Sequence, residues 1–307
     1  MDRLRAFEVF ATVVARGGFA KAADALNTSP ANVTRYVNEL EGHLGSRLLN
    51  RTSRRLSLTE AGEALYERAQ TILEEVAEAE ALASATTLKP RGRLRVNAPL
   101  SFGVRHLAPL WPRFMALYPD VLLDIALTDR VVDMVEEGFD LGIRISRGGS
   151  PTYAARKLAT SRNVLCASPD YLARQGVPET PECLANHARI AYSYTGVPED
   201  WVLLDPEGEP VTVRIPIRLV TNNGDTARAA ALAGQGIIWQ PTFLIGDDLR
   251  AGRLVPVLPN HRIPDIDILA VYPSRRHVSA KVRALVDFLA DAFHGTPGWE
   301  WHPGDTA

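Results

Sequence analysis

The side chains with the clearest chemistry lie between residues 28 and 38 and in a basic stretch shortly after them. Arginine can donate paired hydrogen bonds to guanine, asparagine can pair with the edge of adenine, and hydroxyl groups suit phosphate oxygens. These residues are Thr28, Ser29, Asn32, Thr34, Arg35 and Asn38, followed by Arg51, Arg54 and Arg55. Such side chains could read nucleic acid. A solvated helix followed by a basic loop is the alternative, and charge alone favours that alternative.

The polar residues need a helix that turns them to one side. Ser29 can cap such a helix, and Pro30 fits its first position, where the missing N–H costs nothing. Gly45 can end it. Spacings of three and four predict its buried side, made of Val33, Val37, Leu40 and Leu44. The outward side then carries small and polar residues that allow a close approach to a groove, namely Ala31, Asn32, Thr34, Arg35 and Asn38.

Two shorter helices precede this one. The first, which Gly17 ends, has an apolar face predicted at Leu4, Phe7, Ala11 and Val14. The second has its face at Phe19, Ala22, Ala23 and Leu26. After the third helix, apolar runs at 47–49 and 56–58 flank the basic stretch 50–55 and predict a hairpin with a basic tip. This order of elements predicts a winged helix-turn-helix, whose third helix enters the major groove while the basic wing contacts the backbone or minor groove.

Residues 59–85 follow a helical pattern of different charge. They contain seven glutamates and one arginine, whereas residues 1–58 carry nine Lys/Arg against five Asp/Glu. The apolar positions repeat at a spacing close to 3.5, at Leu58, Ala61, Leu65, Ala69, Ile72, Val76, Ala79 and Ala83. So narrow a seam needs a partner, most simply the same helix of another subunit; the alternative is packing on its own domain. Residues 86–92 then predict a hinge.

The composition of the whole chain limits its class. Its 307 residues suggest two or three domains, and 46% hydrophobic with 23% charged residues is typical of soluble globular protein. The formal net charge is −2, so a nucleic-acid site must come from local charge asymmetry. Cys166 and Cys183 lack metal-ligand spacing and suit a reducing cytosol. The N-terminus does not resemble a signal peptide, and no apolar run approaches about 18 residues, so we expect a cytoplasmic protein without a membrane span.

Strand and helix patterns alternate beyond residue 92, as in an α/β domain with largely parallel strands. Strands are predicted at 94–96, 121–127, 141–145, 164–167, 236–239 and 266–271, and a hairpin at 201–204 and 211–215. One helix is predicted at 227–233. Two further helices have apolar faces at Leu107, Leu110, Phe114 and Leu117, and at Val282, Leu285, Val286, Leu289 and Phe293.

The N-terminal segment resembles the signature of LysR-type transcriptional regulators. Its matching features are F-x-x-V, G-G-F-x-x-A-A-x-x-L, the S-P…V-T-R segment, L-E-x-x-L-G-x-x-L and L-T-x-A-G. FDLGIRI, VLCASPDYLARQGVP, ALAGQGIIWQP and GRLVPVLP are similar to landmarks of that family's effector domain, in the expected order. A departure is Leu49, where the family usually has phenylalanine beneath the wing, so we expect a local packing change there.

The resemblance implies an α+β multi-domain protein: a winged helix-turn-helix, a long linker helix, and a two-lobed α/β effector domain like periplasmic solute-binding proteins. The implied partners are double-stranded promoter DNA and a small-molecule effector between the lobes. It also implies a homodimer through the linker helix and commonly a homotetramer. The expected domains are 1–58, 59–88 and 89–307, with lobe one at 91–161 plus 267–307 and lobe two at 162–266.

Polar residues after the strands of the effector domain could hold a ligand, because parallel α/β sheets bind ligands at the carboxyl ends of strands. The first lobe offers residues 97–103, where the family's effector contacts often lie, together with 128–130 and a strand end; its candidates are Leu100, Ser101, Phe102, Thr128 and Arg144. The second lobe could add Thr195, Asn223 and Trp239. Arginine in a polar cleft would favour a carboxylate-bearing effector.

Each candidate also has a purely structural interpretation. Ser101 and Asn223 could serve only as helix caps. Arg144 could already be paired with an acidic residue of its own lobe. Trp239 could belong to the core.

Other classes of function have little support in the sequence. There is no phosphate-cradling glycine loop, no H-E-x-x-H and no G-x-S-x-G, and Cys166 lies in an apolar strand. A solute-binding protein for transport would need an export signal and would have no basic winged domain. We therefore expect a regulator without cofactor, metal or catalytic residues. Its effector would shift the population of lobe arrangements and so the spacing of the DNA-binding heads.

Overall fold

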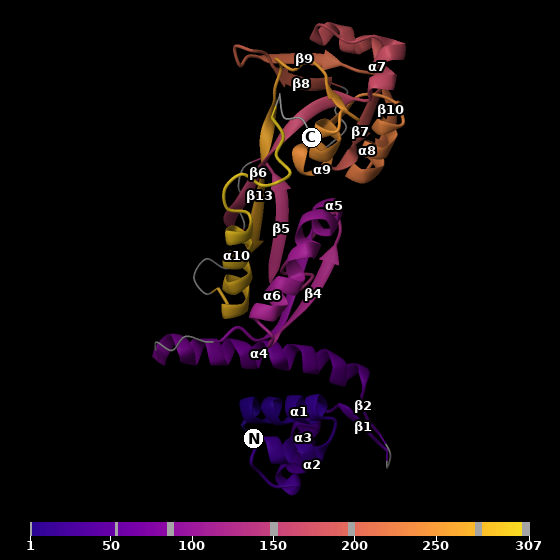
Figure 1. Cartoon of the computed structure of the whole chain (residues 1–307). Coiled ribbons are helices and arrows are strands. Elements are labelled where there is room, and N and C mark those ends of the chain that lie inside the picture. The colour runs from indigo at the N-terminus through magenta and orange to yellow at the C-terminus, as the bar shows by residue number, and fades with distance from the viewer. Residues whose placement is uncertain are drawn as a thin grey trace. The chain divides into compact units, whose positions relative to one another are not determined.

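The computed structural model describes residues 2–52, 55–84, 89–147, 153–195, 200–273 and 278–302. The described chain divides into two compact units, Met1–Lys89 and Pro90–Ala307 (Figure 1). The first unit holds a helical cluster, a small hairpin and a long helix. The second is a mixed α/β unit with two lobes.

Helices α1 (Arg3–Arg16), α2 (Phe19–Ala25) and α3 (Pro30–Leu44) form the body of the first unit. Gly17 ends α1 in the left-handed conformation at φ 71°, and Asn27 at φ 53° turns the chain between α2 and α3. Ser29 caps α3, because its Oγ accepts from the Asn32 N–H at 3.2 Å, and Pro30 occupies the first turn. Gly45 ends α3 at φ 65°. The start and stop signals predicted for the third helix are thus present residue for residue.

The buried faces of these helices correct part of the prediction. In α1 the fully buried residues are Ala6, Val9, Phe10 and Val13, whereas Leu4 is 43% exposed. In α3 Val33, Val37 and Leu40 are buried as predicted, but Leu44 is also 43% exposed. Two overlapping sets in α1 share the spacing of three and four, and only the tertiary packing selects between them. Leu44 is the last residue of α3 and is not part of the apolar cluster of the first unit.

Strands β1 (Leu49–Thr52) and β2 (Arg55–Leu58) pair in antiparallel register and form the predicted wing. Glu41 fixes its base, since its carboxylate accepts from the N–H groups of Leu48 and Leu49 at 2.8 and 3.2 Å. Leu49 itself is 2% exposed, so it fills the position beneath the wing. Gly62 makes the closest approach, because an added Cβ there would lie 2.0 Å from the carbonyl oxygen of Leu48.

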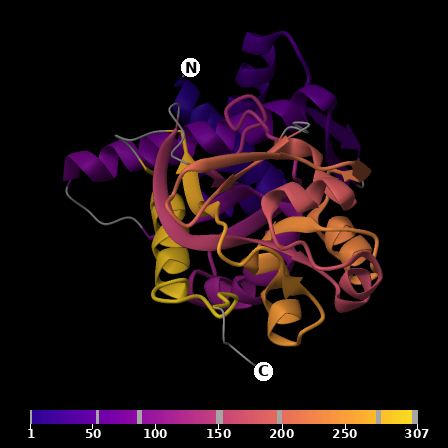
Figure 2. The same ribbon diagram turned by 90° about the horizontal axis from the view of Figure 1, so that it is seen from above.

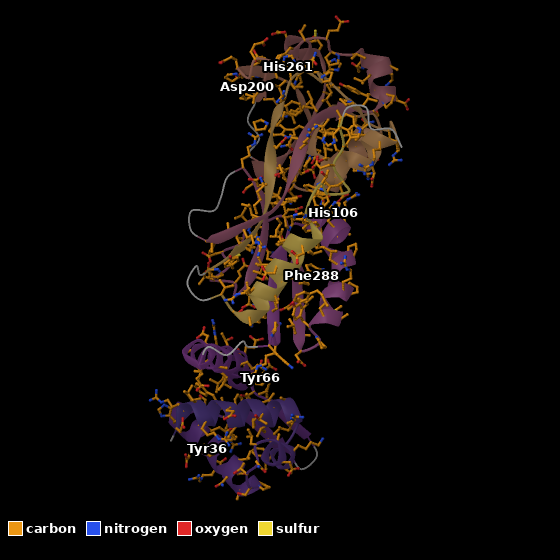
Figure 3. The ribbon with its side chains drawn as sticks, turned by 60° about the vertical axis from the view of Figure 1, so that its left-hand side comes forward. Tyr36, Tyr66, His106, Asp200, His261 and Phe288 are labelled. Carbon is orange, nitrogen blue, oxygen red and sulfur yellow. The ribbon has the colours of Figure 1, made fainter. Side chains whose placement is uncertain are left out.

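Helix α4 (Glu60–Ser84) begins with Glu60 and Glu63 in its first turn. Its first half packs on its own unit: Ala69 is fully buried, and Tyr66, which Figure 3 labels, meets the ring of Phe10 edge-on at 6.4 Å. Farther along, Ile72 and Val76 are only half-buried. Of the predicted seam, Ala61 and Ala79 are exposed, because a straight helix has 3.6 residues per turn and drifts away from a 3.5-residue repeat by about 20° per heptad.

Among the described residues of the second unit, a seven-stranded sheet has the order β11-β6-β13-β5-β3-β4, with β12 (Val255–Pro256) paired to β6. Strand β3 (Gly92–Ala98) is parallel to β4 (Val121–Leu127) and β5 (Leu141–Ser146). Strand β13 (Ile263–Tyr272) is antiparallel to β5 and to β6 (Ala154–Ala167). The expectation of largely parallel strands was therefore wrong for this sheet, which is mixed.

The long strands β6 and β13 connect the two lobes (Figure 1). The first part of β6 pairs with β13, and its last residues pair with β11 (Ile238–Pro241) and β12. Figure 2 shows β6 curving across the unit, with α10 (Ala280–Ala292) beside it. The sequence pattern predicts only residues 164–167 of this strand, because the preceding residues carry Arg156, Lys157 and Arg162 among mostly small and polar residues and show no clear alternation.

The second lobe contains α7 (Pro169–Gln175), α8 (Gly224–Leu232) and α9 (Thr242–Arg250). Strands β7 (Arg189–Tyr192) and β10 (Ile217–Thr221) pair in parallel. Strands β8 (Asp200–Leu204) and β9 (Pro210–Arg214) form the predicted hairpin. Short 3-10 turns η3 (Pro181–Asn186) and η4 (Ser193–Thr195) complete this lobe.

In the first lobe, the helical segment after β3 is irregular. It consists of α5 (Leu100–Phe102), the π-helical turn η1 (Gly103–Leu107), the 3-10 turn η2 (Ala108–Leu110) and α6 (Trp111–Leu117). Leu107 and Phe114 are buried as predicted, whereas Leu117 is 63% exposed. Phe114 packs on Phe288 of α10, which Figure 3 labels, with 5.4 Å between the ring centroids, and this contact brings α6 and α10 together.

One apolar core runs through both lobes. Phe102 of α5 meets Phe243 of α9 edge-on at 5.3 Å and Trp299 at 5.6 Å. The C-terminal segment packs closely on α9, since an added Cβ at Gly246 would lie 2.2 Å from the carbonyl oxygen of Trp299. Trp301 is also buried. On this side the lobes are therefore joined by packing as well as by β6 and β13.

Candidate nucleic-acid interface and effector site

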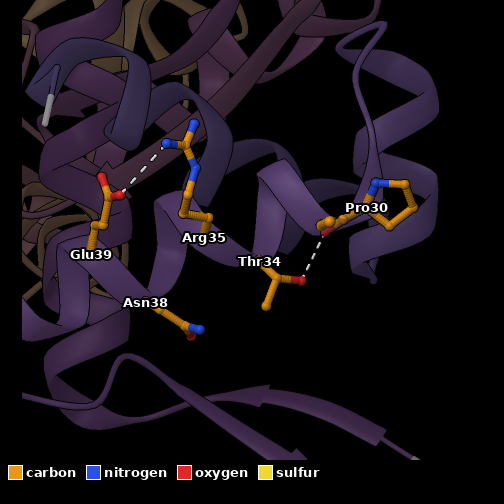
Figure 4. A pocket seen from close by; sticks show the side chains of 6 residues that line it. Pro30, Thr34, Arg35, Asn38 and Glu39 are labelled. Atoms are coloured by element: carbon orange, nitrogen blue, oxygen red, sulfur yellow. Dashed lines mark hydrogen bonds and ion pairs between the residues drawn. The ribbon is translucent and has the colours of Figure 1, made fainter.

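The outward side of α3 forms a shallow open hollow. Pro30, Ala31, Thr34, Arg35, Asn38 and Glu39 line it (Figure 4). Thr34 donates its hydroxyl hydrogen to the carbonyl of Pro30 at 2.8 Å, so the hydroxyl oxygen can still accept a hydrogen bond. Four of the five predicted outward residues, Ala31, Thr34, Arg35 and Asn38, therefore share one surface, whereas Asn32 does not line it. The side chains of Val33, Val37 and Leu40 are buried on the other side of the helix.

The residues before this surface hold the start of α3. Thr28 accepts a hydrogen bond from the Asn32 side chain at 3.3 Å, and Ser29 caps the helix. Both side chains thus have a local structural role. The first N–H groups of a helix also provide donors for an anion such as a phosphate.

Arg35 is the cation at the centre of the α3 surface. Its side chain is 60% exposed and lies 3.9 Å from Glu39, one turn away, while its guanidinium group lies over the ring of Tyr36 at 5.3 Å. Such an exposed i,i+4 pair contributes only about 0.3–0.5 kcal/mol. The guanidinium group can therefore exchange Glu39 for another acceptor at small cost.

The wing carries the remaining predicted contacts. Arg51 lies in β1 opposite Leu56, and Arg55 lies in β2 opposite Thr52. Arg54 lies outside the described residues. The backbone therefore places Arg51 and Arg55 on neighbouring strands of the wing.

Arg144 and Asn97 meet at the carboxyl ends of β5 and β3. Arg144 Nη1 donates to Asn97 Oδ1 at 2.6 Å and to the carbonyl of Ile143 at 3.0 Å. Its Nη2 is buried without a hydrogen-bond partner, and Arg144 forms no ion pair with a carboxylate within the described ranges. Burial lowers the pKa of Arg144, and electrostatic interactions with Tyr153 and Glu137 partly offset this lowering. The acidic partner considered from the sequence is absent from the described part of the chain.

Ser101 lies where the two lobes touch. It is 7% exposed, and its hydroxyl donates to Asp225 of α8 at 2.6 Å. Arg105 forms an ion pair with the other oxygen of the same carboxylate. Burial alone would raise the pKa of Asp225, but the hydrogen bonds from Ser101 and Arg105 and the nearby positive charges outweigh it and lower the pKa. Ser101 is thus part of a polar contact between the lobes and not the cap of α5, whose N-cap residue is Pro99.

Leu100 and Thr128 lie next to each other through their backbones. The Leu100 N–H donates to the Asp129 carboxylate at 2.9 Å, and the Thr128 N–H donates to the carbonyl of Ala98 at 2.9 Å. Thr128 Oγ1 accepts from the N–H of Arg130 at 3.2 Å. These contacts gather the ends of β3 and β4 at one edge of the sheet.

The remaining candidates have mixed placements. Phe102 is fully buried in the aromatic core, so its side chain is packing. Asn223 caps α8 by accepting from the Thr226 N–H at 2.9 Å. Trp239 is half-buried beneath the guanidinium group of Arg147 at 5.3 Å, which links the end of β5 to the second lobe. Thr195 ends the turn η4.

Some residues at this junction were not predicted from the sequence. Asp225 and Arg105 form the charged contact between the lobes, and Asp129 holds the backbone of Leu100. An added Cβ at Gly224 would lie 3.8 Å from Ser101 Oγ and 3.7 Å from Gln240 Oε1, so these groups are close together. In the sequence, the position of Asp225 directly after Asn222-Asn223-Gly224, in the first turn of a helix, was the available signal.

The described residues provide little that suggests catalysis. Burial raises the pKa of the Cys166 thiol, which keeps it protonated. Within the described ranges, no group of three or more His, Cys, Asp or Glu residues could hold a metal ion. No helix of the described ranges is long and apolar enough to cross a membrane.

Comparison with protein families assigns both units. Residues 4–63 match the family described as bacterial regulatory helix-turn-helix protein, lysR family, and residues 88–294 match the LysR substrate binding domain. The regulator DmlR of Escherichia coli (strain K12) is 38% identical over 291 residues, which cover 94% of this chain and 94% of DmlR. A transcriptional repressor of Pseudomonas aeruginosa is 36% identical over 299 residues, covering 97% of this chain and 94% of the repressor.

Solved structures show the same architecture over nearly the whole length. CrgA, a LysR-type transcriptional regulator from Neisseria meningitidis, is similar with a TM-score of 0.60 and 34% identity, covering 95% of this chain and 99% of CrgA. AphB, a virulence activator of Vibrio cholerae, has a TM-score of 0.57 and 29% identity, covering 94% of this chain and 98% of AphB. With a winged helix-turn-helix in one unit and a two-lobed α/β domain in the other, this chain belongs to the LysR family of bacterial transcriptional regulators.

Proposed function

We propose that this regulator binds a specific promoter sequence through α3 and the wing, and that a small carboxylate-bearing effector at the lobe junction modulates this binding. The observation that carries the proposal is the outward side of α3, where Thr34, Arg35 and Asn38 share an exposed surface above a buried apolar face. The proposed division is 1–58 for DNA binding, 59–88 for dimerisation and 89–307 for effector binding.

The DNA contacts follow from the chemistry of this surface. Arg35 would donate to guanine, and Asn32 or Asn38 would pair with adenine. Thr28, Ser29 and the start of α3 would face phosphates, while Arg51, Arg54 and Arg55 of the wing would contact the backbone or minor groove. Ala31 leaves room for the helix to approach the bases.

The effector site would lie at the carboxyl ends of β3, β4 and β5. The buried, unpartnered Nη2 of Arg144 supports a carboxylate ligand, because a buried donor without a partner costs about 1–3 kcal/mol, which an incoming acceptor would relieve. Thr128 and Ser101 would line the same edge, and Asn223, Thr195 and Trp239 would contribute from lobe two. The proposed lobes are residues 91–161 with 267–307, and 162–266.

The seam of α4 supports a homodimer, and a dimer of dimers would bind a split site. Ile72 and Val76 are apolar and half-buried on a helix whose first half already packs on its own unit. The same helix of a second copy would cover them. Effector binding would then shift the population of lobe arrangements and change the distance between DNA-binding heads.

DNA binding is tested by footprinting the full-length protein on the DNA upstream of its own gene and of the neighbouring genes. We expect a protected site, and the Arg51→Gln/Arg54→Gln double variant should bind it with a smaller salt dependence. The slope should fall by about 0.9 for each phosphate that the wing no longer neutralises. An unchanged salt slope would remove the wing from the DNA-binding surface. A protein that protects no site at any salt concentration would contradict the proposal as a whole.

Effector binding is tested by the melting temperature of the protein in the presence of individual carboxylate metabolites. We expect a stabilising carboxylate whose effect is lost in Arg144→Gln. The matched control is Arg113→Gln, since Arg113 lies over Phe288 and forms no ion pair with a described carboxylate. Equal loss in both variants would show that Arg144 has no special role.

A further inference from the structure

The second lobe contains a hollow that the proposed function does not use. Its volume is about 550 Å³, and none of the candidate effector residues lines it. The lining contains two arginines and a histidine but no acidic residue; it comprises Tyr171, Arg174, Gln175, Ala185, Asn186, His187, Ala188, Pro216, Ile217, Arg218, Gly234 and Gln235. The charged residues of this lining are the two arginines, so the hollow favours an anion although the net charge of the protein is −2.

A register shift between β10 and β7 leaves Arg218 outside the ladder pairs. Strand β10 pairs with β7 at Ile217–Arg189 and at Leu219–Ile190, and the register shifts between these two pairs. Arg218 therefore has no partner across the ladder. Bulges re-aim side chains and occur often beside binding sites. Arg218 is exposed and forms no ion pair with any carboxylate of the described ranges.

A glycine provides the space for Arg174. Arg174 Nη2 donates to the carbonyl of Gly234 at 2.8 Å. Gly234 has φ +70°, and an added Cβ there would lie 2.7 Å from the same Nη2, so a side chain at this position would displace the guanidinium group. Arg174 also forms no ion pair with a described carboxylate. Its remaining N–H groups are therefore available to a ligand.

The buried His187 supplies a neutral donor. The N–H of Ala188 donates to the hydroxyl oxygen of Tyr171 at 2.9 Å, and that hydroxyl lies 3.2 Å from His187 Nδ1. Donation from Tyr171 to Nδ1 satisfies both groups and places the ring proton on Nε2. His187 is 6% exposed and lines the hollow, and burial lowers its pKa, so the ring is neutral at pH 7.

We propose that this hollow is a second binding site, for a small oxyanion such as a carboxylate or phosphate compound, held by Arg174, Arg218 and His187 Nε2. The two guanidinium groups provide charge and paired donors, which suit the oxygens of either group. The site lies wholly in lobe two, so its occupancy is separate from the proposed effector site at the lobe junction.

The test is isothermal titration of the full-length protein with inorganic phosphate and, separately, with succinate, against sodium chloride of equal ionic strength. We expect saturable binding of at least one probe, and the probe that binds more tightly identifies the oxyanion. Arg218→Gln and Arg174→Gln should each weaken binding by about tenfold to a hundredfold, because each removes a charge-assisted hydrogen bond. Arg218→Gln is the safer variant, since the side chain is exposed on an edge strand.

Two control variants separate this site from general charge and from the effector site. Arg283→Gln removes an exposed arginine that, like Arg174, bonds a backbone carbonyl, and it should leave binding unchanged. Arg144→Gln tests which site holds succinate: loss of succinate binding in Arg144→Gln but not in Arg218→Gln would assign that binding to the effector site and would contradict a second site for it. Absence of saturable binding of both probes, or an equal loss in Arg283→Gln and Arg218→Gln, would overturn the proposal.

Discussion

Replacing Arg35 by alanine separates DNA recognition from stability. The side chain is 60% exposed, and its ion pair with Glu39 at 3.9 Å contributes about 0.3–0.5 kcal/mol. Alanine is also at least as good a helix former as arginine, so the free energy of unfolding should change by no more than about 0.5 kcal/mol. Removal of a paired hydrogen bond to guanine costs about 1–3 kcal/mol, which corresponds to about a 5- to 150-fold weaker operator affinity.

The assay is fluorescence anisotropy with operator DNA and with a scrambled duplex at the same salt concentration. Arg35→Ala should lose affinity for the operator and retain most of its affinity for the scrambled DNA, which depends on charge. The matched control is Arg5→Ala, which removes one positive charge and one within-helix ion pair from α1. If both variants lose the same affinity for the operator, Arg35 does not read a base and the reasoning is wrong.

Three further predictions concern the scaffold. Gly62→Ala should destabilise the first unit by about 1–3 kcal/mol through its clash with a main-chain carbonyl, whereas Gly42→Ala, which meets nothing within 4 Å, should be neutral or stabilising in thermal unfolding. Asp248→Asn should lower the free energy of unfolding in urea by about 3–5 kcal/mol, because it strips a fully buried carboxylate from two arginines; the exposed pair of Asp247 should contribute below about 1 kcal/mol. The pKa of Asp225 is lowered from 3.8, so the stabilisation from its ionised carboxylate is present above about pH 4 and is lost as the pH falls through the lowered pKa. The difference in melting temperature between wild type and Asp225→Asn should therefore become smaller on acidification. A difference that stays constant with pH would contradict this.

The sequence predicts best what depends on neighbouring residues. Ser29, Pro30 and Gly45 define α3 because a cap, a ring-fixed φ and a left-handed turn are local requirements. The prediction that Leu4 and Leu44 are buried was wrong. Spacing gives the possible faces of a helix, and only packing selects one of them.

The lobe junction could be predicted only in part. The positions of Thr128 and Arg144 at or near strand ends predict that they lie on the same side of the sheet, at the carboxyl ends of its parallel strands. Strands β3, β4 and β5 are parallel to one another and have this arrangement. Asp225, however, meets Ser101 across 124 residues of sequence, and no local pattern indicates such a pair. The same holds for the first half of β6, which has adjacent charges at Arg156 and Lys157 and no clear alternation, and whose partner strand β13 lies about a hundred residues later.

The paired strands β6 and β13 also determine how the lobes can move. Their hydrogen bonds continue from one lobe toward the other, with a register shift between Ile263 and Ile266, where the Asn163 side chain bonds the Pro264 carbonyl at 2.7 Å. Paired strands resist sliding of one past the other but can twist, so rotation of one lobe against the other would change the twist of β6 and β13. The free energy of that change in twist would have to come from tighter binding of the effector to the rotated arrangement. To change the ratio of two lobe arrangements from 1:99 to 99:1, an effector must bind one of them more tightly by about 5.5 kcal/mol. A molecule that binds both arrangements equally would leave their ratio unchanged.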